Sequence, residues 1–489
     1  YGASVVAGYR TVAGTTIRDP RWNGFAVEKG DAILKRAEYT KYSANEFYAR
    51  KAKENGTIAP YLPEDAGSMV ISAGSGLKLD GTINALPTVL GKGGRLDIAA
   101  DSISVVSQYL AGQNTSGGVQ LIAEQLNALE VSSIALGAIR NFGPDGVDMK
   151  VIAEDVRLGD NAKLEGQEYI LAAKKEVTLA QGSSIKTEEN KDKAQGEKTI
   201  YRVDGDAAFA RVSSGPQVDL QRSGTVGRTG SINMAAGATL STTGSMMLDA
   251  TAENQLLGTL TTNGGSVALG AQRISLGEVD STATGLVLDQ GRLNSLDAGE
   301  LILRSSSDIS LYGAADVSAK HLTLRSGGVL GFNNDGAVAK LRADTIRLDN
   351  PGGVLSPRTA TGQGNLQLSA GTITLGEGAY TVAGFNNLNV TATNAVLGEK
   401  TGNLLALANV DMRAPVLTGA KGSNTTIDAT GHSVNIDRVG GDTSPNTADL
   451  GGRLAITADS IRHASSIVLP SGGVRLNALK GDVVLTEGS

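Results

Sequence analysis

The chain has 489 residues with 44 basic and 50 acidic side chains, so its formal net charge is −6. Nucleic-acid binding needs a basic stripe that this balance does not supply, and we expect no nucleic acid among the partners. No stretch approaches the roughly 20 apolar residues of a membrane-spanning helix. Because the sequence holds no cysteine, the fold must be held by packing rather than by disulfide bonds.

Residues 1–66 differ from the rest of the chain, because they hold six of the eleven Tyr and the single Trp. A short helix is predicted from Asp31, and a second helix begins with the capping-box pattern Ser43-Ala-Asn-Glu46. Its end is expected at Asn55-Gly56, where a left-handed residue is easily placed. We interpret the segment as a Tyr-rich cap or excursion with short helices. Its aromatic side chains are a candidate contact surface: Trp22, Tyr39, Tyr42 and Tyr48.

From residue 67 a short phrase recurs, in which a glycine step precedes apolar residues at every second position. The clearest copies read GGRLDIAADSIS at 93–104 and GGRLAITADSIR at 451–462. Weaker copies lie elsewhere along the chain, and several neighbouring copies are 20 to 24 residues apart, which is typical of a stacked repeat protein. The alternation predicts short half-buried strands whose apolar side chains point inward. Examples are Leu96, Ile98, Ile103 and Val105.

Similar strands that recur once per repeat favour parallel stacking over antiparallel hairpins. We therefore predict an all-β protein, a right-handed parallel β-helix (solenoid), with coils at 67–185 and 231–489. The right-handed sense follows the general rule for parallel crossover connections. We expect the coils to continue beyond the last residue of this chain, which reads as an interior stretch of a longer polypeptide.

Residues 186–230 interrupt the repeats. The run KTEENKDKAQGEK at 186–198 is densely charged and predicts a solvent-exposed loop, and GDAAFARVSSG follows at 205–215. We expect one long extra-helical insertion here. Loops of this length often carry function, but an insertion tolerated at the edge of a solenoid is the simpler alternative.

The chain offers little catalytic or metal-binding chemistry. No nucleophile elbow, Walker loop or dinucleotide fingerprint appears, and we expect no enzyme, no cofactor and no metal. The histidines have no metal-ligand spacing and are expected to be surface imidazoles: His321, His432 and His463. Four aspartates recur at equivalent repeat positions and are interpreted as turn-forming residues rather than as catalytic groups: Asp97, Asp101, Asp344 and Asp459.

The stretch at 205–215 resembles a GDGALLRVSSG-like segment of large filamentous haemagglutinin-type surface proteins, which precedes β-helical coils in that family. The matching residues are Gly205, Asp206, Ala208, Arg211, Val212, Ser213, Ser214 and Gly215. Ala207 departs from a glycine of the pattern, and Phe209-Ala210 departs from its leucine pair. The resemblance implies a secreted bacterial cell-surface exoprotein that an outer-membrane β-barrel transporter exports by the two-partner route.

The resulting functional hypothesis is the structural shaft of a large secreted filamentous adhesin, which mediates cell-surface, cell–cell or matrix attachment. One alternative is a carbohydrate-binding β-helix module that contacts surface glycans or matrix polysaccharide through residues 1–61 and 186–230. Further alternatives are a polysaccharide lyase or hydrolase and the stalk of a contact-dependent toxin delivery protein. Lateral or end-to-end self-association is also left open, since an uncovered strand edge invites other chains to pair.

Overall fold

The computed structural model describes residues 3–12, 15–41, 43–62, 64–74, 76–87, 91–108, 118–187, 199–280, 283–356, 358–440 and 449–486. The chain divides into two compact units, Tyr1–Pro63 and Glu64–Ser489. Strands account for 53 % and helices for 6 %, so the protein is all-β, as the alternation predicts. Among the described residues, the helices are too short or too polar to cross a bilayer.

The unit Tyr1–Pro63 contains an antiparallel strand pair, β1 (Ser4–Gly8) and β2 (Asn23–Val27), followed by α1 (Gly30–Ile33) and α2 (Ala44–Glu54). The predicted capping box is confirmed, because the Ser43 hydroxyl accepts from the Glu46 amide and the Glu46 carboxylate accepts from the Ser43 amide. Gly56 has a φ of +65°, so the helix ends where the left-handed residue was expected. The strand pair was not predicted.

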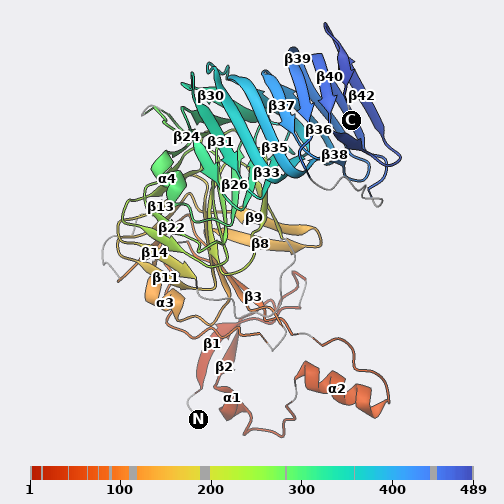
Figure 1. Ribbon diagram of the computed structural model, residues 1–489. Helices are drawn as coiled ribbons and strands as arrows, with labels where there is room; N and C mark the ends of the chain where they lie inside the picture. The colour runs from red at the N-terminus through yellow and green to blue at the C-terminus, as the bar shows by residue number, and fades with distance from the viewer. Residues whose placement is uncertain are drawn as a thin grey trace. The chain divides into compact units, whose positions relative to one another are not determined.

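The unit Glu64–Ser489 is built from three series of strands that pair mainly in parallel (Figure 1). The first series is β3 (Ser68–Ser72), β4 (Arg95–Ala99), β7 (Ser133–Leu136), β12 (Glu168–Ala173), β16 (Ala208–Ser213), β20 (Ser245–Ala250), β23 (Ser266–Ala271), β26 (Glu300–Ser305), β29 (His321–Arg325), β32 (Thr345–Asp349), the second parts of β33 (Gly364–Leu375) and β35 (Phe385–Gly398), β38 (Val416–Gly419) and β41 (Ser466–Val468).

The second series is β6 (Gly118–Ile122), β5 (Ser102–Val106), β10 (Asp155–Leu158), β13 (Glu176–Leu179), β18 (Ser231–Met234), β21 (Asn254–Leu256), β25 (Leu286–Leu288), β24 (Ile274–Gly277), β27 (Ile309–Tyr312), β30 (Gly328–Phe332), β34 (Gly378–Ala383), β36 (Thr401–Ala406) and the first parts of β39 (Asn424–Asp437) and β40 (Arg453–Ala464), with β42 (Gly473–Ala478). All of these pairings are parallel. Similar apolar strands therefore lie on one another rather than folding back as hairpins.

The third series has two runs. One is β11 (Lys163–Gly166), β14 (Ser184–Thr187), β19 (Thr239–Ser241) and β22 (Thr259–Thr261). The other begins with β28 (Asp316–Ser318) and β31 (Val338–Arg342) and passes through the first parts of β33 and β35 to β37 (Asn409–Arg413). It continues through the second parts of β39 and β40 and ends with β43 (Val483–Leu485). Two short helices, α3 (Ala123–Asn127) and α4 (Gln290–Ser295), lie between strands.

One apolar cluster runs through this unit from Leu96 to Ile461. The expected inward residues Ile98, Ile103 and Val105 are all buried in it, which confirms the alternation. The parallel register places aliphatic side chains on aliphatic side chains, since Leu301 pairs with Leu322 and Leu322 pairs with Ile346. Each such buried side chain contributes roughly 1.5 to 3 kcal/mol, so the cluster stabilises the stacked strands that share it.

The expectation of an insertion outside the stacked strands is wrong for Ala208–Ser213. This segment forms β16, which lies within the first series and pairs antiparallel with β12 on one side and with β20 on the other. The reason is its alternating apolar side chains: Ala208, Ala210 and Val212 point into the same cluster as the repeat residues. The charged part of the predicted loop, 188–198, lies outside the described residues.

Candidate functional site

A second sheet covers the outer face of the first series. It contains β8 (Ala138–Gly143), β9 (Gly146–Val151), β15 (Ile200–Asp204) and β17 (Asp219–Ser223), in the order β17-β15-β9-β8, and we call it the side sheet. Val147, Met149, Tyr201 and Leu220 from the side sheet form an apolar cluster with outward-facing side chains of the first series. Those partners are Ala135, Ile170, Phe209, Met247 and Ala268. The outer face is therefore a second core at this point rather than a solvated surface.

The first residues of the family-like stretch shape the turn that enters β16. Gly205 has a φ of +77°, a left-handed conformation that side chains with a Cβ rarely adopt. The Asp206 carboxylate accepts from the backbone amides of residues 226–229 at 2.8 to 3.3 Å. Burial alone would raise the pKa of Asp206, but these four amides outweigh it and hold the pKa below its usual range. Asp206 thus ties this turn to the turn before β18.

The last residues of the stretch join β16 to both of its neighbours. Arg211 is buried, and its Nε donates to Glu168 at 2.7 Å while an Nη donates to the Ser245 hydroxyl at 2.8 Å. Ser213 accepts from the amide of Gly215, and Ser214 donates its own amide to the carbonyl oxygen of Gln167. The structure therefore brings the motif residues together, and their contacts position a strand.

A buried chain of alternating charges crosses from β4 to β16. Arg140 of the side sheet donates to Asp97 at 2.7 Å and lies 3.7 Å from Glu168, which in turn accepts from Arg211. The Ser133 hydroxyl also donates to Glu168. Desolvation would raise the pKa of Glu168, but the two guanidinium groups and the serine hydroxyls outweigh it and hold the pKa below its usual range. Two cations and two anions thus balance one another.

This charge chain borders a cavity of about 180 Å³ between the side sheet and the first series. Lys92 and Arg95 line it, and the Arg95 guanidinium lies 4.0 Å from the centre of the Phe142 ring. The buried charges of the wall, Arg140, Glu168 and Arg211, are already paired with one another. Their pairing fixes the side sheet against the first series, and among the described residues that line the cavity every buried charged side chain has an ion-pair partner.

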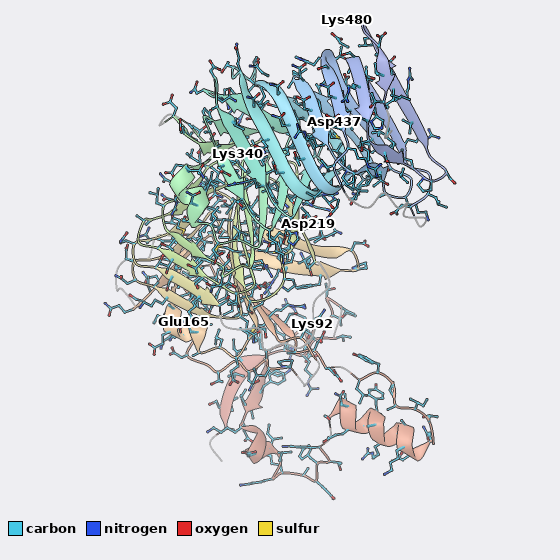
Figure 2. All side chains as sticks on the ribbon, in the orientation of Figure 1. Lys92, Glu165, Asp219, Lys340, Asp437 and Lys480 are labelled. Atoms are coloured by element: carbon cyan, nitrogen blue, oxygen red, sulfur yellow. The ribbon has the colours of Figure 1, made fainter. Side chains whose placement is uncertain are left out.

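The far edge of the side sheet is also anchored by charge. The Asp219 carboxylate of β17 accepts from Arg304 of β26 and from Arg325 of β29; Figure 2 labels Asp219 at this position. Arg222 of β17 donates to Asp249 of β20 at 2.7 Å. Ion pairs at both borders thus enclose the apolar cluster beneath the side sheet.

The aromatic residues proposed as a contact surface lie in the first unit and are exposed. Trp22, Tyr39 and Tyr48 have exposed fractions of 68 %, 51 % and 49 %, and Tyr42 lies outside the described residues. Trp22 packs edge-on against Tyr9 at 5.2 Å, and Tyr48 packs edge-on against Phe47. In the described part of the chain, no ring contact joins these three side chains to one another. The structure therefore does not gather them into one stacking platform.

The expectations for single polar residues have mixed outcomes. His463 is buried with 3 % exposure, so its interpretation as a surface imidazole is wrong; it lies in β40 between Ile436 and Leu485. Asp97 is not a turn residue, because it lies within β4 and pairs with Arg140. Asp459 lies within β40, so it is not a turn residue either, although its carboxylate accepts the backbone amide of Gly431 from the neighbouring strand region.

Sequence reasoning missed the partners of the buried charges, Arg140 and Glu168. The sequence did contain one signal. Glu168 is a charged side chain at an outward-facing strand position, where several equivalent strands carry small or hydroxylated residues. Tyr201, an aromatic residue far from the Tyr-rich start, was a second signal of a covered outer face. Neither signal identifies its partner, because the partner lies on a strand far away in the sequence.

No family model, curated protein or solved structure matches the chain. The likeness at 205–215 therefore remains a resemblance of one short stretch, and the function has to be proposed from the architecture.

Proposed function

We propose that Glu64–Ser489 is a right-handed parallel β-helix that serves as the structural shaft of a large secreted filamentous adhesin. The observation that carries this proposal is that three series of mainly parallel strands share one continuous apolar cluster. Stacked strands add about 4.8 Å of length each, so such a scaffold spans distance with few residues.

The register supports the proposed coil. Asn365 pairs with Asn387 and Asn387 pairs with Asn409 in the third series, while Tyr380 pairs with Leu404 and Leu404 with Ile427 in the second. Each passage of the chain through the series thus returns to an equivalent position in the next layer. The right-handed sense rests on the rule for parallel crossover connections.

Secretion and surface attachment rest on the resemblance at 205–215, which supports export by an outer-membrane β-barrel transporter. The cysteine-free sequence is compatible with such a route, because no disulfide has to form before or after export. The proposed role is to hold a binding region away from the cell or to join cells to one another and to matrix.

Deletion of residues 387–408 tests the coil, because it removes one register period and joins Asn386 to Asn409. Lys340→Cys and Lys480→Cys give the only two thiols for spin labels, and Figure 2 labels both positions. We expect the deletion variant to fold and the distance between the labels to shorten by about 4.8 Å, measured by pulsed electron–electron double resonance.

Deletion of residues 387–397 is the matched control, because it removes part of a period and puts the following strands out of register. We expect this variant to lose its native circular dichroism spectrum and its cooperative melting. If the full-period deletion unfolded while the partial deletion folded, the coil would be refuted.

Antibodies against the chain test the surface location. They should label intact cells of the source bacterium, and labelling that requires permeabilised cells would overturn the secretion part of the proposal. Beads coated with the chain then test attachment, by comparison with beads coated with albumin on cell layers and on purified matrix.

A further inference from the structure

A second cavity, of about 280 Å³, opens on the outer face of the second series, away from the side sheet. Its floor comes from β24, β27 and β30, which pair in parallel so that Ser275 lies beside Ser310 and Tyr312 beside Phe332. Its walls include Asp280 and Arg358, from the connections that follow β24 and β32. We call it the arginine cavity.

One guanidinium of this cavity is rigidly held. Arg358 lies 4.1 Å from the centre of the Phe332 ring, which stacks on Tyr312 at 5.3 Å. Arg358 also donates to the Ser310 hydroxyl at 2.9 Å and lies 3.7 Å from Asp308. Asp308 is fully buried, and its nearby carboxylate balances the charge of Arg358.

The other guanidinium has no such partner. Among the described residues, no hydrogen bond or ion pair engages the side chain of Arg273, and its Nε is shielded from solvent without an acceptor. The Ser275 hydroxyl is likewise shielded from solvent and has no hydrogen-bond partner among the described residues, and Ser275 has an exposed fraction of 0 %. Buried donors normally have partners in folded proteins. Both residues line the cavity, so a ligand acceptor that reaches these donors there would satisfy them.

The remaining polar groups differ in kind from those of a plain anion site. The carboxylate of Asp280 and the side-chain amide of Asn333 line the same cavity. A carboxylate repels a phosphate or sulfate ion but accepts hydrogen bonds from hydroxyl groups. A volume of about 280 Å³ also exceeds what a small inorganic ion fills, and it suits one sugar ring.

We propose that the arginine cavity binds a uronic-acid residue of an acidic saccharide. The sugar carboxylate pairs with Arg273 and accepts from the Ser275 hydroxyl, since a guanidinium presents parallel donors to a carboxylate. The ring hydroxyls donate to Asp280 and exchange hydrogen bonds with Asn333. This site goes beyond the shaft function and does not depend on it.

Calorimetric titration of the whole chain with galacturonate, galactose and inorganic phosphate tests the site. We expect galacturonate to bind at least about tenfold more tightly than galactose or phosphate, because only galacturonate offers both a carboxylate and hydroxyl groups. If phosphate bound as strongly as galacturonate, the assignment of a sugar ligand would be refuted. If galacturonate did not bind, the site itself would be refuted.

Arg273→Gln should weaken galacturonate binding by about tenfold or more, because it removes the cation that meets the carboxylate. Arg413→Gln is the matched control, since Arg413 is an exposed arginine at the end of β37, away from this cavity. The backbone carbonyl of Arg273 accepts from the Leu286 amide, and the substitution leaves that bond in place. Because the side chain makes no hydrogen bond or ion pair among the described residues, both variants should melt at the temperature of the parent chain. Equal affinities of the two variants would refute the role of Arg273.

Asp280→Ala separates a sugar site from a simple anion site. Loss of the acceptor should weaken binding of galacturonate, whereas a simple anion site would bind galacturonate and phosphate more tightly without the repelling carboxylate. The label distances of the deletion experiment do not depend on this cavity, so failure of the site and failure of the shaft remain distinguishable.

Discussion

Single buried charges hold the side sheet to the first series, and Glu168 is the central one. Glu168→Gln would leave Arg140 and Arg211 close together without the carboxylate between them. Breaking a buried ion pair in this way typically costs 3 to 5 kcal/mol, so we expect a loss of about 3 kcal/mol in the free energy of unfolding, measured in urea.

Glu154→Gln is the matched control, because Glu154 pairs with Lys174 and Lys175 at the surface. A surface pair contributes less than about 1 kcal/mol. Equal losses in the two variants would contradict the structural role assigned to Glu168.

Another prediction at the residue scale concerns His463 and pH. Burial lowers the pKa of His463 below that of the unfolded chain, despite an opposing backbone hydrogen bond at Ser465. The unfolded state then binds the proton more readily, so this contribution to stability is complete above about pH 6.5 and is lost as the pH falls through the folded-state pKa. His463→Leu should reduce the drop in melting temperature between pH 7.5 and pH 5.5. If the drop in melting temperature were unchanged, protonation of His463 would not be coupled to unfolding.

At the scale of elements, the side sheet packs on the antiparallel strand β16 and on its neighbours in the first series. Phe209 of β16 is fully buried in the second core, where its ring packs edge-on against Tyr201 at 6.0 Å. Phe209→Ala should cost about 3 to 5 kcal/mol and accelerate amide hydrogen exchange in β9, β15 and β17. Phe142→Ala makes the same change at a ring that is 48 % exposed, and it should cost less than about 1 kcal/mol. Unchanged exchange in Phe209→Ala would contradict this packing.

At the scale of the whole molecule, the pairing of neighbouring strands predicts that damage stays local. Leu96 is fully buried in β4, between β3 and β7. Leu96→Asp buries an unpaired charge there, so we expect rapid hydrogen exchange in these three strands while β33 to β42 keep their protection. Uniform loss of protection along the chain would show a single cooperative core instead.

Local chemistry made part of this structure predictable. The capping box of Ser43 and Glu46 and the inward positions of Leu96 and Ile98 depend on residues a few positions apart, so spacing alone reveals them. The same holds for the all-β class, because a period of two requires strands wherever one face is buried.

The sequence by itself thus determined that strands recur from residue 67 onward and which face of these repeat strands is apolar. Only the tertiary structure decided that β16 runs antiparallel, that Arg140 meets Asp97 and Glu168, and that Arg273 and Arg358 share a cavity. The physical reason is that these contacts join residues on separate strands. Their distance in space depends on how the repeats stack, and alternation within a strand carries no information about the polar side chains of the strands beside it.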